Sequence, residues 1–186
     1  MEHIAQLKKR YPNVKSDIAD LTSVFETFKK EVPSSNDDIR LNLSLANTRA
    51  RLRMTTLYYI AGIRGLLVAG TGNKVEDFGV GFYTKYGDGG VDLSPIADLM
   101  KSDVYDLGAF LEIPKSIQNA APTDGLFGDS RTDEEQIGAS YDELEWAMLE
   151  AEKNVKNENF TKREKEVLKL VAEGLTNTEI SKQLFS

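Results

Sequence analysis

Apolar side chains recur at helical spacing through the first third of the chain. Four of them after Asp20 lie at positions i, i+3, i+4 and i+7 of one helical face: Leu21, Val24, Phe25 and Phe28. A helix over Ile4 to Tyr11 and an alternating strand over Val14 to Ile18 are expected before this face. Residues 37–61 contain neither glycine nor proline, which predicts one long helix of about 37 Å at ~1.5 Å per residue.

A different pattern follows that helix. The short apolar run Leu66 to Ala69 ends at Gly70, which is typical of a buried parallel strand that opens into a loop. In open α/β sheets, ligands bind at that end of the strands. Four capping-box patterns further on predict helix starts: Thr132–Glu135, Ser140–Glu143, Thr161–Glu164 and Thr176–Glu179. The order of elements predicts an α/β fold followed by a helical tail.

Domain borders are expected near the C-terminal end of the chain. The polar segment Asn-Val-Lys-Asn-Glu-Asn over 154–159 reads as a linker. We therefore predict one domain over 1–153 and a helical tail over 160–186.

Composition and charge exclude several classes of protein. The chain is 40% apolar and 28% charged, as in an ordinary globular protein, and its net charge of −7 argues against nucleic-acid or anionic-lipid coating. It has no cysteine and a single histidine, His3, which removes disulfides, thiolate zinc sites and chemistry that needs two imidazoles. Neither a signal peptide nor an apolar run of about 20 residues is visible, so we expect no membrane span and a cytoplasmic location by default.

The predicted long helix carries an unusual run of positive charge. Arg49, Arg51 and Arg53 occur with no acid between residues 47 and 65. At about 100° per residue, Arg49 and Arg53 share a face and Arg51 points nearly the opposite way. The arginines on one side of the helix are expected to contact a ligand, and those on the other side a partner surface. The alternative is that all these guanidinium groups are solvated on an amphipathic helix.

The densest candidate site is the segment Gly70 to Asp92, which holds seven glycines in 23 residues. Glycines let backbone amides approach a ligand closely. Hydroxyl and ammonium groups that suit phosphate come from Thr71, Thr84, Lys74 and Lys85, and hard oxygen ligands come from Glu76, Asp77, Asp88 and Asp92. The segment predicts a nucleotide with a metal ion; the alternative is a glycine-rich surface loop. Neither standard phosphate-loop pattern occurs in the chain.

Further candidates lie downstream. Lys101 begins a predicted helix, where an ammonium group suits phosphate, and Thr123 sits in a predicted turn. Residues 124–150 hold nine acids against the single basic Arg131, and we expect these acids to be solvated groups in the first turns of helices.

Several uncommon motifs occur together in one order: NTRARLRM at 47–54, LVAGTGNKVE at 67–76, GFYTKYGDGGVDL at 81–93, Pro122-Thr123, and SYDE at 140–143. On these motifs, residues 1–150 closely resemble the ammonia-dependent NAD synthetases. The resemblance implies a partial fold of the ATP-pyrophosphatase type, also called adenine nucleotide alpha hydrolase-like, with a parallel sheet and flanking helices. It also implies a homodimeric ligase of NAD biosynthesis that uses Mg2+ and ATP to adenylate deamido-NAD before ammonia displaces AMP.

The same resemblance implies roles for seven residues by position in the motifs. Thr71, Lys101 and Thr123 would contact ATP, and Glu76 would bind Mg2+. Arg51, Lys85 and Asp92 would contact deamido-NAD. No catalytic residue is implied.

Two departures from the family pattern change the expectation for this chain. The pyrophosphate-binding string Ser-Gly-Gly-x-Asp-Ser occurs nowhere in the sequence, and no histidine follows His3 to form the family's terminal His-Lys pair. We therefore expect a shortened or rearranged member with little turnover by itself.

The tail suggests a second function. Residues 160–186 resemble the start of a LuxR-type helix-turn-helix, but the recognition helix would follow Ser186, so the expectation is against DNA binding. A non-enzymatic interaction or regulatory protein that uses this tail is the alternative to an enzyme.

Overall fold

The computed structural model describes residues 2–157. The chain divides into two compact units, Met1–Met148 and Leu149–Ser186, and the cavities described below belong to the first. The predictions for the tail over 160–186 lie outside the described residues. The predicted linker over 154–159 begins within the last described helix, and its remainder is also outside them.

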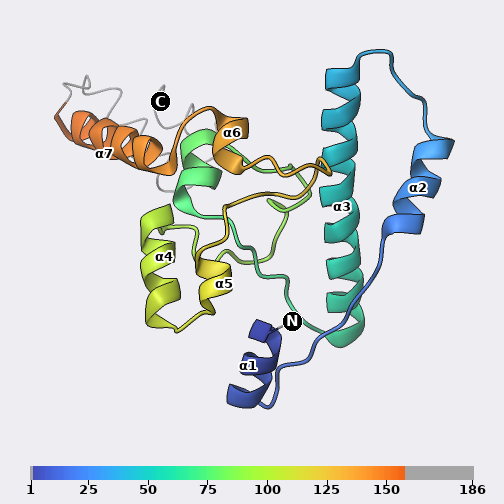
Figure 1. Cartoon of the computed structure of the whole chain (residues 1–186), viewed down its shortest axis with the longest axis horizontal. Helices are drawn as coiled ribbons and strands as arrows, with labels where there is room; N and C mark the ends of the chain where they lie inside the picture. The colour runs from blue at the N-terminus through green and yellow to red at the C-terminus, as the bar shows by residue number, and fades with distance from the viewer. Residues whose placement is uncertain (1, 158–186) are drawn as a thin grey trace, which may run out of the picture. The chain divides into compact units, whose positions relative to one another are not determined.

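The described residues are mainly helical (Figure 1). The elements are α1 (Glu2–Arg10), α2 (Thr22–Glu31), α3 (Asp38–Arg64), the π-helix η1 (Val75–Val80), α4 (Lys101–Phe110), α5 (Lys115–Gln118), α6 (Asp133–Ile137) and α7 (Tyr141–Asn157). None of the helices in this part of the chain is both long and apolar enough to cross a bilayer.

The helices were predicted better than the strands. The predicted strand over Val14 to Ile18 is wrong, because this segment has no regular structure. The predicted strand over Leu66 to Ala69 is reduced to a single parallel bridge between Ala69 and Leu93. Within residues 2–157, no longer strand is formed, so the parallel sheet of the predicted α/β fold stays a prediction.

Helix α3 confirms the long helix expected from the sequence, and both of its ends have a physical cause. The Asp37 side chain accepts a hydrogen bond from the backbone N–H of Arg40 at 3.0 Å, which caps the first turn. Gly65 ends the helix in the left-handed conformation, with φ of 63°, where glycine has no steric penalty. Its N–H donates to the last carbonyls of the helix.

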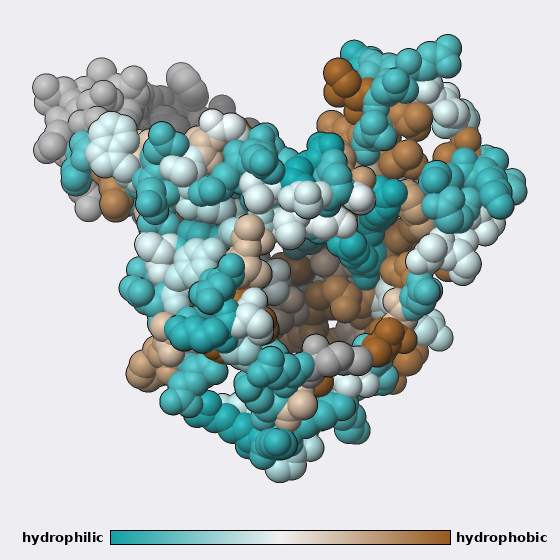
Figure 2. All heavy atoms as spheres, viewed as in Figure 1, coloured by the Kyte–Doolittle hydropathy of each residue, from teal (hydrophilic) through white to brown (hydrophobic). Residues whose placement is uncertain are grey.

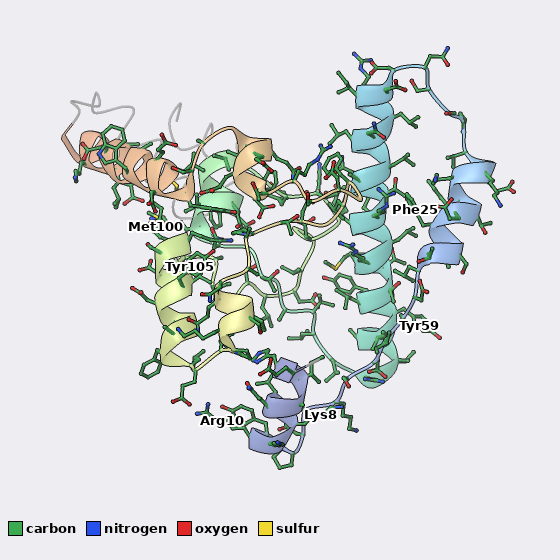
Figure 3. All side chains as sticks on the ribbon, in the orientation of Figure 1. Lys8, Arg10, Phe25, Tyr59, Met100 and Tyr105 are labelled. Carbon is green, nitrogen blue, oxygen red and sulfur yellow. The ribbon has the colours of Figure 1, made fainter. Side chains whose placement is uncertain are left out.

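Helix α2 lies beside α3 (Figure 1), and a cation over an aromatic ring joins the two. Phe25 of α2 is buried and points toward α3 (Figure 3). The guanidinium carbon of Arg49 lies 4.2 Å from the centroid of the Phe25 ring. Of the predicted apolar face after Asp20, only Phe25 is therefore buried against α3, and Val24 and Phe28 remain exposed.

Two small clusters of buried side chains lie along α3 in the first unit. Ala46 and Ala50 pack with Leu126, and Met54 and Ala61 pack with Val68. Small alanine side chains allow the neighbouring loops to come close to the helix. In the space-filling view, the molecule is hollowed beside α3, with hydrophobic side chains in the depth of the hollow (Figure 2).

The predicted helix start at Thr132 is confirmed by its capping box. The Thr132 hydroxyl accepts from the Glu135 N–H at 3.2 Å, and the Glu135 carboxylate accepts from the Thr132 N–H at 2.7 Å. The same reciprocal pattern joins Ser140 and Glu143 at the start of α7.

Replacing Thr132 by alanine should lower the free energy of unfolding by about 1 kcal/mol, because the backbone N–H of Glu135 in the first turn of α6 loses its hydrogen-bond acceptor. Urea denaturation measures this change. Thr27→Ala, at an exposed site inside α2, is the matched control and should cost less. Equal losses in the two variants would contradict the capping role.

Candidate functional site

A cavity of about 640 Å3 opens beside α3. Its wall includes residues from α3, the loop at 69–71, η1, the start of α4, the loop at 122–127, and α6. Four of the residues singled out in the sequence line it together: Thr71, Glu76, Lys101 and Thr123. These residues are far apart in the sequence, and the folded chain brings them to one hollow.

An ion pair lies in the wall of this cavity. The Lys101 Nζ donates to the Glu76 Oε1 at 2.7 Å, and the two side chains are only 16% and 15% exposed. The backbone around the pair is also fixed. The Asn73 side-chain oxygen accepts from the N–H groups of Val75 and Glu76 at the start of η1, and the Lys74 N–H donates to the Leu99 carbonyl just before α4.

Two residues that the sequence did not single out as site residues complete this group. The Tyr141 hydroxyl donates to the Glu76 Oε1 at 2.7 Å and lies 3.3 Å from the Asp133 Oδ2. The Lys101 Nζ is 4.5 Å from the centroid of the Tyr141 ring. Asp133 and Tyr141 are both buried, at 7% and 6% exposed, and the Asp133 Oδ1 is a buried atom without a hydrogen-bond partner.

The electrostatics of the cavity act in opposite directions on the pKa values of two of its acids, Glu76 and Asp133. Burial alone would raise the pKa of Glu76, but hydrogen bonds from Lys101 and Tyr141 and the Lys101 charge hold that pKa below its ordinary value. Burial raises the pKa of Asp133, and the nearby Glu76 charge adds to the rise. The pKa of Tyr141 lies far above its ordinary value because the ring is buried and its hydroxyl faces carboxylates. Tyr141 is therefore a neutral donor between two acids.

The two threonines occupy different surroundings in the same wall. Thr71 follows Gly70 immediately after the parallel bridge between Ala69 and Leu93. The Thr123 hydroxyl donates to the Arg131 carbonyl at 2.9 Å and accepts from the Gly125 N–H at 3.2 Å. The turn predicted at 122–125 is thus held by the side chain of Thr123 itself.

A second cavity, of about 750 Å3, shares Met54, Tyr83 and Val91 with the first. Lys85 lines it together with three tyrosines: Tyr58, Tyr83 and Tyr86. The Lys85 Nζ is 5.0 Å from the centroid of the Tyr86 ring. A cation among aromatic rings suits a flat anionic group, because the rings supply stacking area and the ammonium supplies the opposite charge.

Arg51 and Asp92 line neither cavity and instead support the second one. The Arg51 Nε donates to the Lys85 carbonyl at 3.0 Å. Asp92 accepts from the Tyr58 hydroxyl at 3.2 Å and from the Val68 N–H at 2.8 Å. Both side chains therefore fix residues that do line it.

The two arginine directions predicted on α3 are observed, and both serve the fold. Arg49 donates to the Leu126 carbonyl at 2.6 Å, and Arg53 lies 3.4 Å from the Asp124 and Gly125 carbonyls. The expected partner surface on this face stays a prediction. Thr84, a candidate phosphate donor, is buried and donates to the Asn47 side chain at 2.8 Å.

The acids over 124–150 were predicted to be solvated, and this is wrong for Asp133. It occupies the first turn of α6, as expected of an acid near a helix N-terminus, but the turn faces the cavity. The SYDE motif pointed to Tyr141 only as the neighbour of a capping serine. The available signal was a tyrosine at the first position of a helix that the sequence predicts.

The donor set can hold a magnesium ion if phosphate completes the coordination. Among residues 2–157, no three His, Cys, Asp or Glu side chains converge as a ready-made metal site. Mg2+ is commonly held by one or two carboxylates with water and substrate phosphates. Glu76 in the cavity wall, with the unpartnered Asp133 Oδ1 nearby, fits that requirement.

Comparisons with known proteins agree on one family. The pattern described as NAD synthase matches residues 2–184. The NH3-dependent NAD+ synthetase of Carboxydothermus hydrogenoformans is 36% identical over 162 residues, which cover 87% of this chain and 66% of that protein. The corresponding enzyme of Alkaliphilus metalliredigens is 48% identical over 109 residues, or 59% of this chain and 43% of that protein.

Two solved structures resemble the fold. The NMN synthetase from Francisella tularensis has a TM-score of 0.65 at 28% identity, covering 87% of this chain and 62% of that one. The NH3-dependent NAD synthetase from Campylobacter jejuni has a TM-score of 0.54 at 28% identity, covering 83% and 59%. The chain thus spans less than two thirds of the length of each of these relatives and structures.

Asp133→Asn should raise the free energy of unfolding at pH 7. The carboxylate form of Asp133 is disfavoured in the folded chain, because its pKa is raised and one oxygen has no partner, whereas the neutral amide carries no such cost. Below the ordinary pKa of 3.8, Asp133 is protonated in both the folded and the unfolded chain and costs no stability. As the pH rises from 3.8 through the higher pKa of the folded chain, the unfolded chain loses its proton first, and the folded chain loses stability. The gain should therefore vanish on acidification below about pH 4.

Urea denaturation at several pH values measures this gain. Asp142→Asn, at an exposed site in the first turn of α7, is the control and should give no stabilisation at pH 7. A loss of stability in Asp133→Asn at pH 7 would contradict the buried, uncompensated carboxylate.

Proposed function

Because this chain belongs to the NAD synthase family, we propose that it binds ATP and deamido-NAD for the ammonia-dependent synthesis of NAD. The observation that carries the proposal is the meeting of Thr71, Glu76, Lys101 and Thr123 in one cavity, with Lys85 in the adjoining one. A nucleoside triphosphate and a dinucleotide need two connected spaces, and cations are needed where their phosphates meet.

The first cavity is proposed to take ATP. The Lys101 ammonium would offset phosphate charge, and the hydroxyls of Thr71 and Thr123 would accept or donate hydrogen bonds at the nucleotide. Glu76 would hold Mg2+, which supplies charge neutralisation and orients the phosphates when it is bound.

The second cavity is proposed to take deamido-NAD. Lys85 would pair with a carboxylate or phosphate of the dinucleotide, with the tyrosine rings beside it. Arg51 and Asp92 would act by holding Lys85 and Tyr58 in place.

The proposed reaction has two steps. A carboxylate oxygen of deamido-NAD forms a bond to the α-phosphorus of ATP, and the bond from that phosphorus to pyrophosphate breaks. Ammonia nitrogen then forms a bond to the activated carbonyl carbon, the carbon–oxygen bond to AMP breaks, and one proton is released. The side chains described here would bind and orient the reactants and neutralise charge during the first step.

The chain is also proposed to form a homodimer. Large apolar side chains near the C-terminal end of α3 and just after it are exposed in the single chain: Tyr59, Ile63, Leu66 and Leu67. Exposed apolar groups that lie together commonly mark an interaction surface.

Sedimentation of the purified chain should give the mass of two copies, and Ile63→Asp should shift it to one. Ile39→Asp, at an exposed apolar site at the other end of α3, is the control and should leave the mass unchanged. A single-copy mass for the unmodified chain would contradict the homodimer.

Ligand binding tests the proposed function directly, because the sequence has no Ser-Gly-Gly-x-Asp-Ser string and turnover depends on more than the described cavities. Deamido-NAD at about 100 times its Kd should stabilise the chain by about 2.7 kcal/mol. Lys85→Ala should remove at least half of that gain, since a hydrogen bond to a charged group contributes roughly 1.5–3 kcal/mol. The thermal unfolding midpoint with and without ligand measures both.

Lys115→Ala, which removes a surface lysine of α5, is the matched control and should keep the full ligand shift. Nicotinate mononucleotide forms a second arm, because one similar structure is an NMN synthetase. A larger shift with the mononucleotide than with deamido-NAD would move the proposal to that substrate. No shift with either ligand would contradict it.

A further inference from the structure

The cation and the anion best placed for ligands in the first cavity are bonded to each other. Lys101 and Glu76 form a 2.7 Å ion pair in the cavity wall, and each side chain is about five-sixths buried. A phosphate that approaches Lys101 therefore meets an ammonium whose charge is already paired with a carboxylate. A metal ion that approaches Glu76 finds the carboxylate occupied by a cation.

Neither ligand alone can break this pair without cost. If phosphate takes Lys101, then Glu76 keeps a buried negative charge close to Asp133 with the phosphate nearby. If a metal ion takes Glu76, then Lys101 keeps a buried positive charge next to the metal. Removing one partner of a buried ion pair leaves the other uncompensated, and such a change is strongly unfavourable.

The two ligands together remove both costs. Metal-bound phosphate brings an anion for Lys101 and a cation for Glu76 at the same time. We infer that the Lys101–Glu76 pair is exchanged for phosphate–Lys101 and metal–Glu76 pairs, so that this pair excludes metal-free nucleotide and nucleotide-free metal from the cavity. The inference rests on the proposed function, because it takes the nucleotide site to be this cavity.

Tyr141 is suited to remain in place during the exchange. It is buried, its hydroxyl donates to the same Glu76 oxygen that Lys101 binds, and its ring faces the Lys101 ammonium at 4.5 Å. The hydroxyl can keep Glu76 oriented after Lys101 leaves, and the ring keeps a favourable contact with the ammonium.

The backbone around Lys101 is anchored independently of the ion pair. The Asp103 carboxylate accepts from the Met100 N–H at 2.9 Å, and the Glu145 carboxylate accepts from the N–H and hydroxyl of Ser102 at 2.8 and 2.6 Å. The exchange therefore requires only that the Lys101 side chain rotates away from Glu76. Lysine has a long flexible stem that allows such movement.

Two variants test the exchange, because each should strengthen the binding of one ligand in the absence of the other. In Glu76→Gln the carboxylate charge is gone, so Lys101 is released, and ATP in EDTA should bind about tenfold more tightly than to the unmodified chain. The gain from adding Mg2+ should shrink at the same time. Isothermal titration calorimetry measures both affinities.

In Lys101→Met the competing cation is gone, so Mn2+ without nucleotide should bind about tenfold more tightly. ATP should bind more weakly, because its phosphate loses the ammonium. Electron paramagnetic resonance of free Mn2+ measures the metal affinity without any turnover, and this arm decides the question even if Glu76→Gln does not fold.

Glu26→Gln is the matched control, because it breaks an exposed Lys–Glu pair at 3.1 Å on α2 and should change neither affinity. If Lys101→Met binds Mn2+ no more tightly, or a folded Glu76→Gln binds metal-free ATP no more tightly, the exchange is overturned while the proposed function stands. If the unmodified chain binds no ATP with Mg2+, the nucleotide assignment of the cavity fails together with the exchange.

Discussion

The arrangement of the first unit depends on hydrogen bonds from the arginines of one helix to the backbone carbonyls of two loops. Arg49 and Arg53 reach carbonyls of residues 124–126, and Arg51 reaches the carbonyl of Lys85. These two loops carry walls of the two cavities. Because the described residues form only one parallel bridge, few sheet hydrogen bonds are available to position the loops. A guanidinium group, with five donors in a fixed plane, can take that task.

The chemistry around Lys101 in the first cavity follows from an unequal number of opposite charges. Glu76 and Asp133 face one ammonium, that of Lys101, and a tyrosine hydroxyl with a single proton to donate. Glu76 receives both of the short hydrogen bonds and is held as a carboxylate with a lowered pKa. Asp133 is left with a long contact and an unpartnered oxygen, which is why burial dominates its pKa. A cation that enters the cavity would correct this imbalance.

Local signals in the sequence predicted the elements that depend on local physics. The absence of glycine and proline over 37–61 predicted α3, and the Thr132–Glu135 pattern predicted the start of α6, because helix propensity and capping act within a few residues. Motif resemblance singled out Glu76 and Lys101, but no local pattern indicates that they bind each other. Asp133 was misjudged because its helix position is visible in the sequence, whereas the direction that the turn faces depends on packing.

The same dependence on packing explains why the site and the stability of the chain are linked. Natural proteins tolerate unfavourable groups at functional sites when a ligand later satisfies them. Here the unfavourable group, Asp133, lies on the short helix α6, and its neighbour Glu76 lies on the short π-helix η1. Such elements gain most from ligands that bridge them, because a phosphate and a metal would connect η1, α4 and the loop before α6 through charge. The wall of the cavity is therefore built from separate segments, and the proposed ligands would join them.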